Sequence, residues 1–502
     1  MRKLGVVLAS AALAVGALFL GSYVGPAGPM RKAKAQTVSA RPNFVFILTD
    51  DMRKDDLAYM PKTRSLLQKG GMSFENAFVS HALCAPSRAT IMRGQYPHRT
   101  GVWSNSATDS SSTSIGGWEA YRTKGNEADN VATRLQGAGY RTGLFGKYMN
   151  RYAETTYVPQ GWDRWFAAAT LGDPKYFGYD VSDNGTTRHY GTNDSDYITD
   201  VLSMETDEFI ATNVSQGIPF FAYVAPIAPH APATPAPRDA HDYDGIQGPR
   251  LSSFNEGNVS DKPSWIRQLP KLSSSQTSAI NKRHENRVES LQAVDDLVEE
   301  VVNTLSTTRA PGGSNALKDT YIFFTSDNGF HHGEHRIPEQ KWRPYEEDVN
   351  VPLLVRGPEV TPGSTTYKMA LNTDFMPTFM NLACTSASTC DTQNWSYVPD
   401  GRSLEPVLHR GVTTWRSAVL LEASANYSPP YRGIRTIRTG GVPKRKYVEY
   451  RDSQKELYDL DQDPHEITNQ YAPSPVVDSL ATRLQALKTC AGETCFTAED
   501  GP

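Results

Sequence analysis

Cys84 is the side chain best placed in this sequence to act as a nucleophile, because a proline, a hydroxyl and an arginine follow it. The segment reads Cys84-Ala85-Pro86-Ser87-Arg88. Proline favours the first turn of a helix, which predicts that Cys84 lies at a helix N-terminus, where free backbone N–H groups and the helix dipole attract anions. Arg88 comes one turn later and returns to the same face. The alternative is a buried structural cysteine beside an ordinary helix start.

The other four cysteines form two close pairs in the sequence. Cys384 lies near Cys390, and Cys490 lies near Cys495. This spacing predicts two short disulfide loops, which an exported protein keeps. Cys84 is then left without a partner, and an unpaired thiol in an oxidising compartment is the one to examine for reactivity.

Two apolar runs each end in a pair of oxygen-bearing side chains. The runs are residues 43–48 and 320–326, and the pairs are Asp50 with Asp51 and Asp327 with Asn328. Such runs are typical of strands buried on both faces of a parallel sheet, and open α/β sheets bind ligands at the carboxyl ends of these strands. Four oxygen ligands without a cysteine–histidine set suit a hard cation, Ca²⁺ or Mg²⁺, better than zinc. The alternative for Asp50 and Asp51 is a turn in which aspartate caps a helix.

Basic side chains follow two further predicted strands. Lys147 comes after residues 140–145, and His230 comes after residues 219–224. Prolines on both sides of His230 stiffen the backbone and would hold the imidazole in place. A solvated loop lysine and a structural turn histidine are the alternatives for these two residues.

Histidines and a lysine also come soon after the second oxygen pair. His331 and His332 are adjacent, and Lys341 follows nine residues later. Adjacent side chains point apart, and the spacing and the glutamate of the helical two-histidine zinc motifs are absent. The sequence therefore gives little support for a zinc site here.

The elements that must position these residues alternate between apolar strands and amphipathic helices. A long helix beginning near Asn281 carries its apolar residues on one stripe, and a polar region at residues 238–276 is expected to wrap the surface. The alternation predicts an α/β domain at residues 41–405, with a large, mainly parallel sheet between helices. Short turn-bounded strands then predict a smaller α+β subdomain with an antiparallel sheet at residues 406–502.

The N-terminal segment has the pattern of an export signal. Met1, Arg2 and Lys3 precede an apolar run at residues 4–24, and a small-residue site follows at residues 33–35. Residues 1–35 are therefore predicted to be a signal peptide and the protein to be exported, to the periplasm, the cell surface or the medium. The apolar run is long enough to span a bilayer, so an uncleaved membrane anchor is the alternative. No cysteine lies close behind it, which argues against a lipoprotein anchor.

The overall charge excludes general polyanion binding. The chain has 51 basic and 55 acidic residues and a net charge of -4. Neither nucleic acid nor an anionic membrane surface would be attracted by such a balance. Any specificity for an anion must therefore be local.

The order of these residues resembles that of the sulfatase family. Cys84 to Arg88 matches the family's C-x-P-S-R signature, and residues 456–469 look like its C-terminal segment. The other matching positions occur in the family's order, and they are Asp50, Asp51, Gly146, Lys147, Pro229, His230, Asp327, Asn328, Gly329 and Lys341. The resemblance covers about residues 41 to 469 and implies an alkaline-phosphatase-like α/β fold.

The resemblance also implies a mechanism. Cys84 would be oxidised by a maturation enzyme to formylglycine, whose hydrated form attacks the sulfur of a sulfate ester. The bound cation, Ca²⁺ rather than Mg²⁺, would be held by the modified Cys84 with Asp50, Asp51, Asp327 and Asn328. Arg88 would orient the nucleophile, Lys147 and Lys341 would bind the sulfate, and His230 with Lys341 would protonate the departing alcohol.

One position departs from the family's pattern. Many members carry a histidine two positions after the lysine that matches Lys147, and this chain has Met149 there. The surrounding segments resemble the N-acetylglucosamine-6-sulfatase branch, which implies a sulfated sugar of the glucosamine 6-sulfate type. We hypothesise that His331 supplies the missing base.

Other functions compete with this interpretation. Within the same superfamily the alternatives are an arylsulfatase of broad specificity, acting on aryl sulfates, and a phosphatase or phosphonate monoester hydrolase. A catalytically silent carbohydrate-binding protein is the alternative from a different class, and it would need no modified cysteine. The mass of the Cys84 peptide discriminates between the carbohydrate-binding protein, in which Cys84 stays unmodified, and the enzymes.

Overall fold

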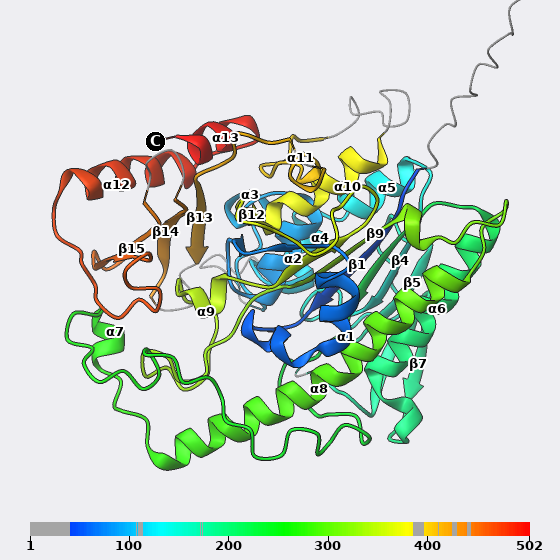
Figure 1. Cartoon of the computed structure of the whole chain (residues 1–502), viewed down its shortest axis with the longest axis horizontal. Helices are drawn as coiled ribbons and strands as arrows, with labels where there is room; N and C mark the ends of the chain where they lie inside the picture. Colours follow the sequence, from blue (N-terminus) through cyan, green and yellow to red (C-terminus); the bar gives the residue numbers. More distant parts are fainter. Residues whose placement is uncertain are drawn as a thin grey trace, which may run out of the picture. The chain divides into compact units, whose positions relative to one another are not determined.

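The computed structural model of this chain describes residues 41–501, apart from residues 107, 109–113, 171, 173, 385–395, 410, 424–428 and 439–442. Arg41–Pro502 form one compact unit built around a ten-stranded sheet (Figure 1). In spatial order the strands are β11 (Ser364–Thr366), β2 (Met72–Phe74), β10 (Leu353–Arg356), β9 (Thr320–Ser326), β1 (Asn43–Thr49), β8 (Phe220–Ala225), β4 (Arg141–Gly146), β5 (Arg164–Ala168), β6 (Tyr179–Asp183) and β7 (Thr186–Tyr190).

The middle of this sheet is parallel, as the apolar runs predict. β1 pairs in parallel with β8 and β9, and β4 pairs in parallel with β8 and β5. Antiparallel pairs join β10 to β9 and β2, β6 to β5, and β7 to β6. The predicted mixed, mainly parallel α/β sheet is therefore confirmed.

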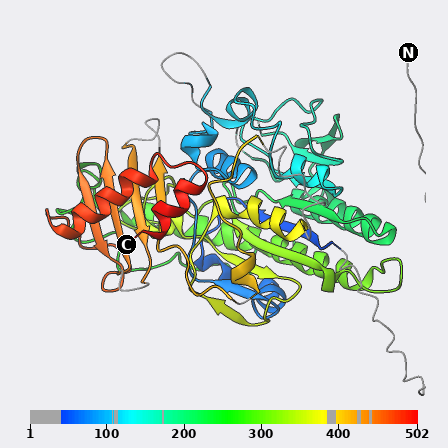
Figure 2. The ribbon, with the colours of Figure 1, turned by 90° about the horizontal axis from the view of Figure 1, so that it is seen from above.

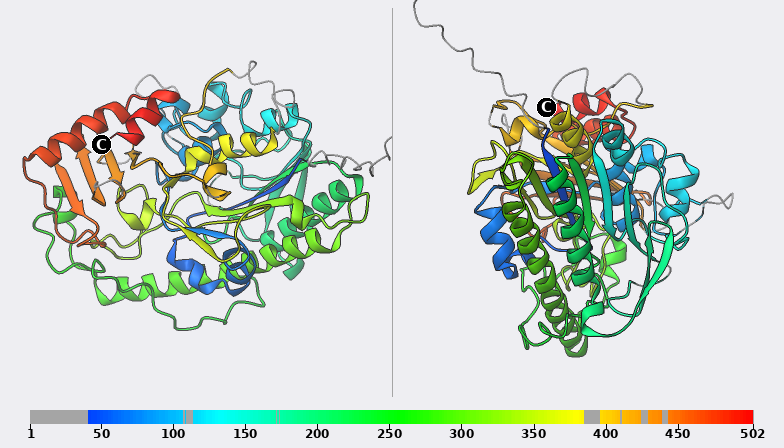
Figure 3. Two further views of the ribbon diagram at one scale, coloured as in Figure 1. Left: turned by 45° about the horizontal axis from the view of Figure 1, so that its top comes forward. Right: turned by 90° about the vertical axis from the view of Figure 1, so that its right-hand side faces the viewer.

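Helices cover both faces of the sheet because its central strands are apolar on both sides. Phe44, Phe46 and Leu48 of β1 pack against α2 (Cys84–Arg93), α5 (Val131–Gly137) and α10 (Phe375–Ala383). Val45 and Ile47 pack against α6 (Ile198–Gln216) and α8 (Ser274–Thr307) on the opposite face. Figure 3 shows α6 and α8 running side by side along the sheet. This sandwich rigidly supports the carboxyl ends of β1, β4, β8 and β9.

The remaining helical segments within the described residues 41–408 are short. They are η1 (Asp55–Tyr59), α1 (Pro61–Thr63), η2 (Arg64–Gln68), α3 (Pro97–Thr100), α4 (Gly117–Thr123), η3 (Asp194–Asp196), α7 (Ser264–Arg267), η4 (Leu317–Asp319), α9 (Glu346–Val349), η5 (Asn372–Asp374) and α11 (Glu405–Leu408). A two-stranded sheet pairs β3 (Ala77–Phe78) with β12 (Ala370–Leu371).

A second, four-stranded antiparallel sheet forms in the C-terminal part. Its order is β13 (Ala418–Ala423), β14 (Tyr431–Thr436), β15 (Arg445–Tyr450) and β16 (Lys455–Asp459). α12 (Pro475–Leu487) packs on this sheet, and α13 (Glu493–Asp500) follows it (Figure 2). The predicted smaller antiparallel sheet is confirmed, whereas the boundary between residues 405 and 406 stays a prediction.

One sequence prediction about a helix position was wrong. The long helix starts at Ser274 rather than near Asn281, because the Ser273 side chain caps it by accepting a hydrogen bond from the Gln276 N–H. The polar region 238–276 contains α7 and the first residues of α8. At α8 the first turns are polar and carry no apolar stripe, so the sequence pattern did not reveal the helix start.

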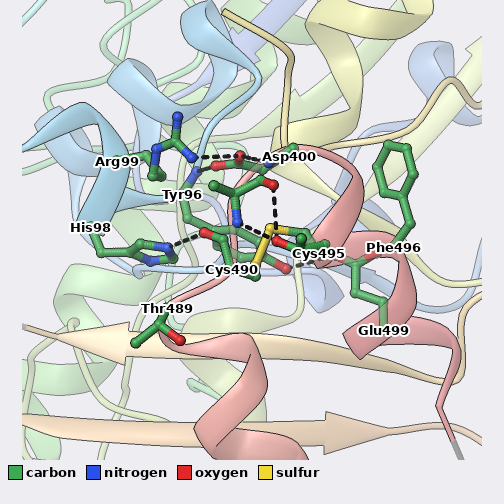
Figure 4. The surroundings of a disulfide bond; sticks show 12 residues. Tyr96, His98, Arg99, Asp400, Thr489, Cys490, Cys495, Phe496 and Glu499 are labelled. Atoms are coloured by element: carbon green, nitrogen blue, oxygen red, sulfur yellow. Dashed lines mark hydrogen bonds and ion pairs between the residues drawn. A yellow bond between two sulfur atoms is a disulfide. The ribbon is translucent and has the colours of Figure 1, made fainter.

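The disulfide between Cys490 and Cys495 is present, as predicted, and Cys390 lies outside the described residues. Figure 4 shows how its loop docks on α3. The ring of His98 donates from Nδ1 to Glu422 Oε1 at 3.0 Å, and its Nε2 lies 3.0 Å from the Cys490 carbonyl oxygen. The Gly492 N–H donates to Asp400 Oδ1 at 2.7 Å. The C-terminal helices are thereby tied to the segment that follows α2.

We expect the His98–Glu422 pair to make folding stability depend on pH. Burial lowers the pKa of His98, but its hydrogen bond to Glu422 outweighs burial and raises the pKa above 6.5. A raised histidine pKa stabilises the fold below about pH 6.5 and loses that contribution as the pH rises through the folded pKa. His98→Gln should therefore lower the free energy of unfolding by roughly 1–2 kcal/mol near pH 6 and by less near pH 8.5. Urea unfolding at the two pH values measures this, and equal losses would refute it.

Residues 1–40 lie outside the described part, so the predicted signal peptide and its cleavage stay predictions. Among the helices of the described residues, none has the length and hydropathy that crossing a membrane requires.

Candidate active site

The carboxyl ends of four neighbouring strands bring the predicted site residues together. The Asp327 N–H donates to the Thr49 carbonyl at 3.1 Å, and the Asp50 N–H donates to the Ala228 carbonyl at 3.2 Å. The Lys147 N–H donates to the Ala225 carbonyl at 2.8 Å. These backbone hydrogen bonds continue the parallel ladders by one or more residues, and they hold the loops that carry the site side chains at one edge of the sheet.

Helix α2 presents Cys84 at its first turn, as predicted. Leu83 is extended (φ -150°) and precedes the helix, and Gly94 ends it in the left-handed conformation (φ 62°). The Ala85 N–H, which has no partner within the helix, donates to Asn105 Oδ1 at 3.0 Å. Every residue of α2 is buried. The helix start is therefore rigid, and Cys84 cannot easily change position.

Cys84 lies within reach of both acidic and basic groups. Its Sγ is 2.8 Å from Lys341 Nζ and 3.4 Å from Asp50 Oδ1. Burial and the negative charge of Asp50 raise the pKa of the Cys84 thiol to about 12. At neutral pH the unmodified thiol is therefore protonated, and a protonated thiol is a poor nucleophile.

Three acidic side chains and one amide surround a place for a hard cation. Ligand atoms of Asp50, Asp51, Cys84 and His230 all lie within 4.8 Å of one another. Asn328 donates from Nδ2 to Asp51 Oδ1 at 2.7 Å, and its own Oδ1 is buried without a hydrogen-bond partner. An orphaned oxygen beside buried carboxylates is the donor set that Ca²⁺ or Mg²⁺ satisfies. The residues present thus fit the predicted cation.

Asp327 completes this set through different contacts. Its Oδ1 accepts a hydrogen bond from the Asp51 N–H at 3.1 Å, and its Oδ2 accepts one from Arg88 Nε at 2.8 Å. Burial and the charge of Asp50 raise the pKa of Asp327. Arg88, at 2.8 Å from Asp327 and 3.8 Å from Asp50, screens part of the repulsion between these two acids, and a metal cation bound among them would reduce it further.

Positive side chains balance these acids at short range. Lys147 Nζ donates to Asp50 Oδ2 at 2.5 Å, and Lys341 Nζ donates to Asp51 Oδ1 at 2.5 Å. Burial alone would lower the pKa of each lysine, but the neighbouring carboxylates raise both pKa values. Arg88 also donates to the Lys147 carbonyl at 2.8 Å. The site therefore keeps fixed positive charges beside Cys84, as stabilisation of an anionic transition state requires.

His230 faces the same cluster from the end of β8. Its Nδ1 donates to the Ala231 carbonyl at 2.7 Å, which leaves Nε2 as the atom near Asp51 Oδ2 at 3.7 Å. Tyr176 donates its hydroxyl to the His230 carbonyl at 2.8 Å. With 18% of its side chain exposed, His230 lies between the cluster and solvent. This position suits a group that exchanges a proton with a ligand and with water.

His331 is anchored by Asp348 and by the segment that precedes Lys341. Its Nδ1 donates to Asp348 Oδ1 at 2.6 Å, and its backbone N–H donates to the Gln340 carbonyl at 2.8 Å. Burial lowers the pKa of His331, but Asp348 outweighs burial and raises it. Within the described residues, no hydrogen bond or ion pair joins His331 to Cys84 or to the cation cluster.

Arg287 of α8 is a site residue that the sequence reasoning missed. Its guanidinium donates to the backbone carbonyl of Asp51 and to that of Pro229, the latter at 3.1 Å. It therefore couples the loop that carries the cation ligands to the loop that carries His230. A signal was present, because Arg287 lies one turn before Leu291 on the apolar stripe of the helix, where a charge needs buried partners.

Comparisons with known proteins agree with this geometry. The family described as Sulfatase matches residues 42–385, and the family described as N-sulphoglucosamine sulphohydrolase, C-terminal, matches residues 333–490. The human N-acetylglucosamine-6-sulfatase is 33% identical over 501 residues, which cover 91% of this chain and 86% of that protein. An arylsulfatase of Volvox carteri is 30% identical over 512 residues, which cover 92% of this chain and 76% of that protein.

Solved structures share the fold. One, described as a complex with its substrate D-glucosamine-2-N,6-O-disulfate, has a TM-score of 0.69 at 21% identity and covers 92% of this chain and 99% of that one. The phosphonate monoester hydrolase of Agrobacterium radiobacter has a TM-score of 0.65 at 21% identity, with coverage of 89% and 95%. At these identities the likeness establishes the alkaline-phosphatase-like architecture and does not choose between sulfate and phosphorus esters.

Proposed function

The chain belongs to the sulfatase family and is a sulfuric ester hydrolase, and from this premise we propose that its substrate is a glucosamine-type sugar bearing a 6-O-sulfate. The support for the sugar is the identity of 33% to the human N-acetylglucosamine-6-sulfatase along nearly the whole chain. The observation that supports sulfate ester hydrolysis is the position of Cys84, because its Sγ lies 3.4 Å from Asp50 Oδ1 and 2.8 Å from Lys341 Nζ.

We propose that Cys84 is converted to formylglycine by a maturation enzyme. A formylglycine at this position supplies, as its hydrate, the hydroxyl that attacks sulfur. The raised pKa of the Cys84 thiol supports a requirement for modification, since the thiol itself would stay protonated. Arg88 lies one turn further along α2 and donates to Asp327 and to the Lys147 carbonyl, so it fixes the groups around residue 84.

We propose that Asp50, Asp51, Asp327, Asn328 and the modified residue 84 hold Ca²⁺, with Mg²⁺ as the alternative. The cation supplies Lewis-acid polarisation of the sulfate oxygens and neutralises charge. The buried, unpartnered Asn328 Oδ1 supports an oxygen-ligand site.

Lys147 and Lys341 bind the sulfate group in this proposal. Both ammonium groups are buried and both now donate to the carboxylates of the cation cluster. With a divalent cation to balance those carboxylates, each lysine is free to donate to a sulfate oxygen. Because the two lysines approach the cluster from different segments, they fix the orientation of the sulfate as well as its charge.

His230, acting with Lys341, donates the proton that the departing sugar hydroxyl needs. Its Nε2 lies at the cluster and its ring is partly exposed, so it can be recharged from water. The Arg287 and Tyr176 hydrogen bonds to the backbone on either side hold this ring in place.

The substrate proposal is tested by comparing turnover on defined esters. The matured protein is incubated with N-acetylglucosamine 6-sulfate, with N-acetylgalactosamine 4-sulfate, and with an aryl sulfate and an aryl phosphate of the same leaving group. We expect the highest kcat/KM on the 6-sulfate. Equal rates on both sugars and a faster aryl sulfate would favour a broad arylsulfatase, and a faster aryl phosphate would favour a phosphatase or phosphonate monoester hydrolase.

The base that replaces the histidine absent at Met149 is proposed to be His331. His331→Ala should then lower kcat by roughly 10²- to 10⁴-fold with little change in KM. Asp348→Asn keeps the ring but removes its anionic partner, so it should shift the acid limb of the pH profile to lower pH. His332→Gln is the neighbouring control. Near-normal sulfate release by His331→Ala would remove His331 from the mechanism.

We further propose that the protein is exported, after cleavage of residues 1–35. The disulfide between Cys490 and Cys495 supports an oxidising compartment. The N-terminal sequence of the protein recovered from its native host tests the cleavage site.

A further inference from the structure

A cavity lies outside the cluster of residues around Cys84 and the candidate cation site. Its volume is about 450 Å³, and none of the cation-site residues lines it. Four segments build it: the residues that follow β1, Leu251, helix α9 with Asn350, and the C-terminal residues Lys444, Pro464 and His465. A cavity of this volume accommodates a small molecule or one sugar unit.

Most charges that line this cavity are already paired. Arg53 donates two hydrogen bonds to Asp55, at 2.8 and 2.9 Å. Lys54 pairs with Glu75 at 3.0 Å. These pairs therefore add little net charge to the wall.

The negative charge of Glu346 is paired with basic side chains of the C-terminal sheet. Its carboxylate accepts from Arg435 at 2.9 Å and from Lys446 at 2.9 Å, and Lys446 also pairs with Glu466 at 2.8 Å. Two cations thus hold the Glu346 carboxylate, although its charge still acts on Lys444 and raises the pKa of that lysine.

Lys444 is the lysine of the lining that makes no ion pair with any described residue. In the described part of the chain its Nζ has no hydrogen bond and no ion pair, although the side chain is half-buried. Burial and the nearby positive charge of Arg435 lower the pKa of Lys444. Glu346 and Asp461 oppose this lowering without cancelling it, so an anion that enters the cavity would further stabilise the Lys444 ammonium.

Uncharged polar atoms on the wall also lack partners. Glu347 Oε2 and Asn350 Oδ1 are buried and make no hydrogen bond. Burial and the charge of Glu334 raise the pKa of Glu347 to about 8, so this carboxyl is mostly protonated at neutral pH and is able to donate. Leu251 and Pro464 supply apolar surface. The lining therefore combines one ammonium without an ion pair, one donor, one acceptor, the imidazole of His465 and an apolar patch.

We propose that this cavity binds a single oxyanion, a sulfate or carboxylate group, carried on a sugar or free in solution. The observation that carries the proposal is Lys444, the one unpaired ammonium among paired charges in the described lining. A sugar-borne group is the preferred source, because the lining also offers apolar surface and hydrogen-bonding atoms to a ring. That preference rests on the proposed sulfated-sugar substrate, whereas the anion site itself does not.

The cavity is structurally linked to the cation site. Arg53 NH1 donates to the Phe330 carbonyl at 2.6 Å, and the Phe330 N–H donates to the Glu347 carbonyl at 2.9 Å. Arg53 lies three residues after Asp50, and Phe330 lies two residues after Asn328. The segment that carries Asp50 and Asp51 therefore also lines this cavity through Arg53, and the segment that carries Asn328 is hydrogen-bonded to two residues of the lining.

The test separates binding in the cavity from catalysis. Lys444→Met removes the charge and keeps the apolar stem, Lys444→Arg keeps the charge, and Lys271→Ala removes an exposed lysine elsewhere. Each full-length variant is titrated with a fluorescent heparin hexasaccharide and, separately, with inorganic sulfate, while hydrolysis of an aryl sulfate is measured in parallel. Thermal unfolding confirms that each variant is folded.

We expect Lys444→Met to weaken hexasaccharide binding about 5- to 10-fold, as loss of one charged contact does. The hexasaccharide affinity of Lys444→Arg and of Lys271→Ala should stay within about twofold of that of the parent protein. Aryl sulfate turnover should be unchanged in all three variants. If Lys444→Met weakened the binding of inorganic sulfate but not of the hexasaccharide, the occupant of the cavity would be a free anion. Two results would refute the proposed anion site. One is an equal loss of affinity in Lys444→Met and Lys271→Ala, and the other is no loss of affinity for either probe in Lys444→Met. Loss of aryl sulfate hydrolysis in the parent protein would instead refute the proposed function.

Discussion

Replacing Cys84 by alanine is expected to abolish sulfate release, by about 10⁴-fold or more, as removal of a nucleophile does. The physical reason is geometric, because α2 holds residue 84 at 3.4 Å from Asp50 Oδ1 and 2.8 Å from Lys341 Nζ, and no other nucleophile is held in that place in the described residues. Small-to-small substitution at this buried position should leave the fold intact. Sulfate release and thermal unfolding are measured on the same samples.

Mass spectrometry of the Cys84 peptide supplies the independent control. Protein produced with a maturation enzyme should contain a peptide lighter than the unmodified one by about 18 Da, the difference expected for formylglycine. Activity should rise in proportion to the modified fraction. Full activity in protein whose peptide carries only the unmodified thiol would contradict the proposal, and so would a modified but inactive protein.

Asp51→Asn and removal of the cation are expected to have the second-largest effect. Asp51 accepts hydrogen bonds from Lys341 and Asn328 and lies beside Asp50 and His230, so it joins every part of the cluster. Loss of its charge should lower kcat/KM by at least about 10³-fold, as loss of one preorganised charge at a metal centre does. Chelation of the parent protein should produce a comparable loss, which Ca²⁺ restores.

Calcium binding gives a readout that does not depend on turnover. In the parent protein Ca²⁺ at about 100 times its Kd should stabilise the fold by about 2.7 kcal/mol, visible as a raised unfolding temperature. Asp51→Asn should lose most of that shift, whereas Asp180→Asn, an exposed acid paired with His189, should keep it. The same shift in both variants would show that the cation binds elsewhere.

The parts of the candidate site that depend on short stretches of sequence could be predicted. A buried strand is a short apolar run, so residues 43–48 and 320–326 could be placed, and the polar pairs at their ends followed from chain order alone. Pro86 likewise marked the first turn of α2. These predictions needed no knowledge of distant residues.

Elements whose stability comes from distant partners were missed. β16 (Lys455–Asp459) carries charged residues and is a strand because β15 pairs with it. α13 is polar along most of its length, and buried contacts of Glu499 with Arg416 and Arg402 hold it in place. In neither case does the local sequence reveal the partner.

The same distinction applies to the nucleophile segment itself. By its residue types and order, the sequence alone determined the family resemblance, the position of Cys84 at a helix start and the oxygen-bearing side chains at two strand ends. Only the tertiary structure decided which charge meets which: Lys147 pairs with Asp50 across 97 residues, Arg88 with Asp327 across 239, and Lys341 with Asp51 across 290. It also decided that His331 pairs with Asp348 and that Arg287 holds the backbone of Asp51. Electrostatic energy depends on distance in space, and chain order does not encode that distance until the sheet brings the strand ends together.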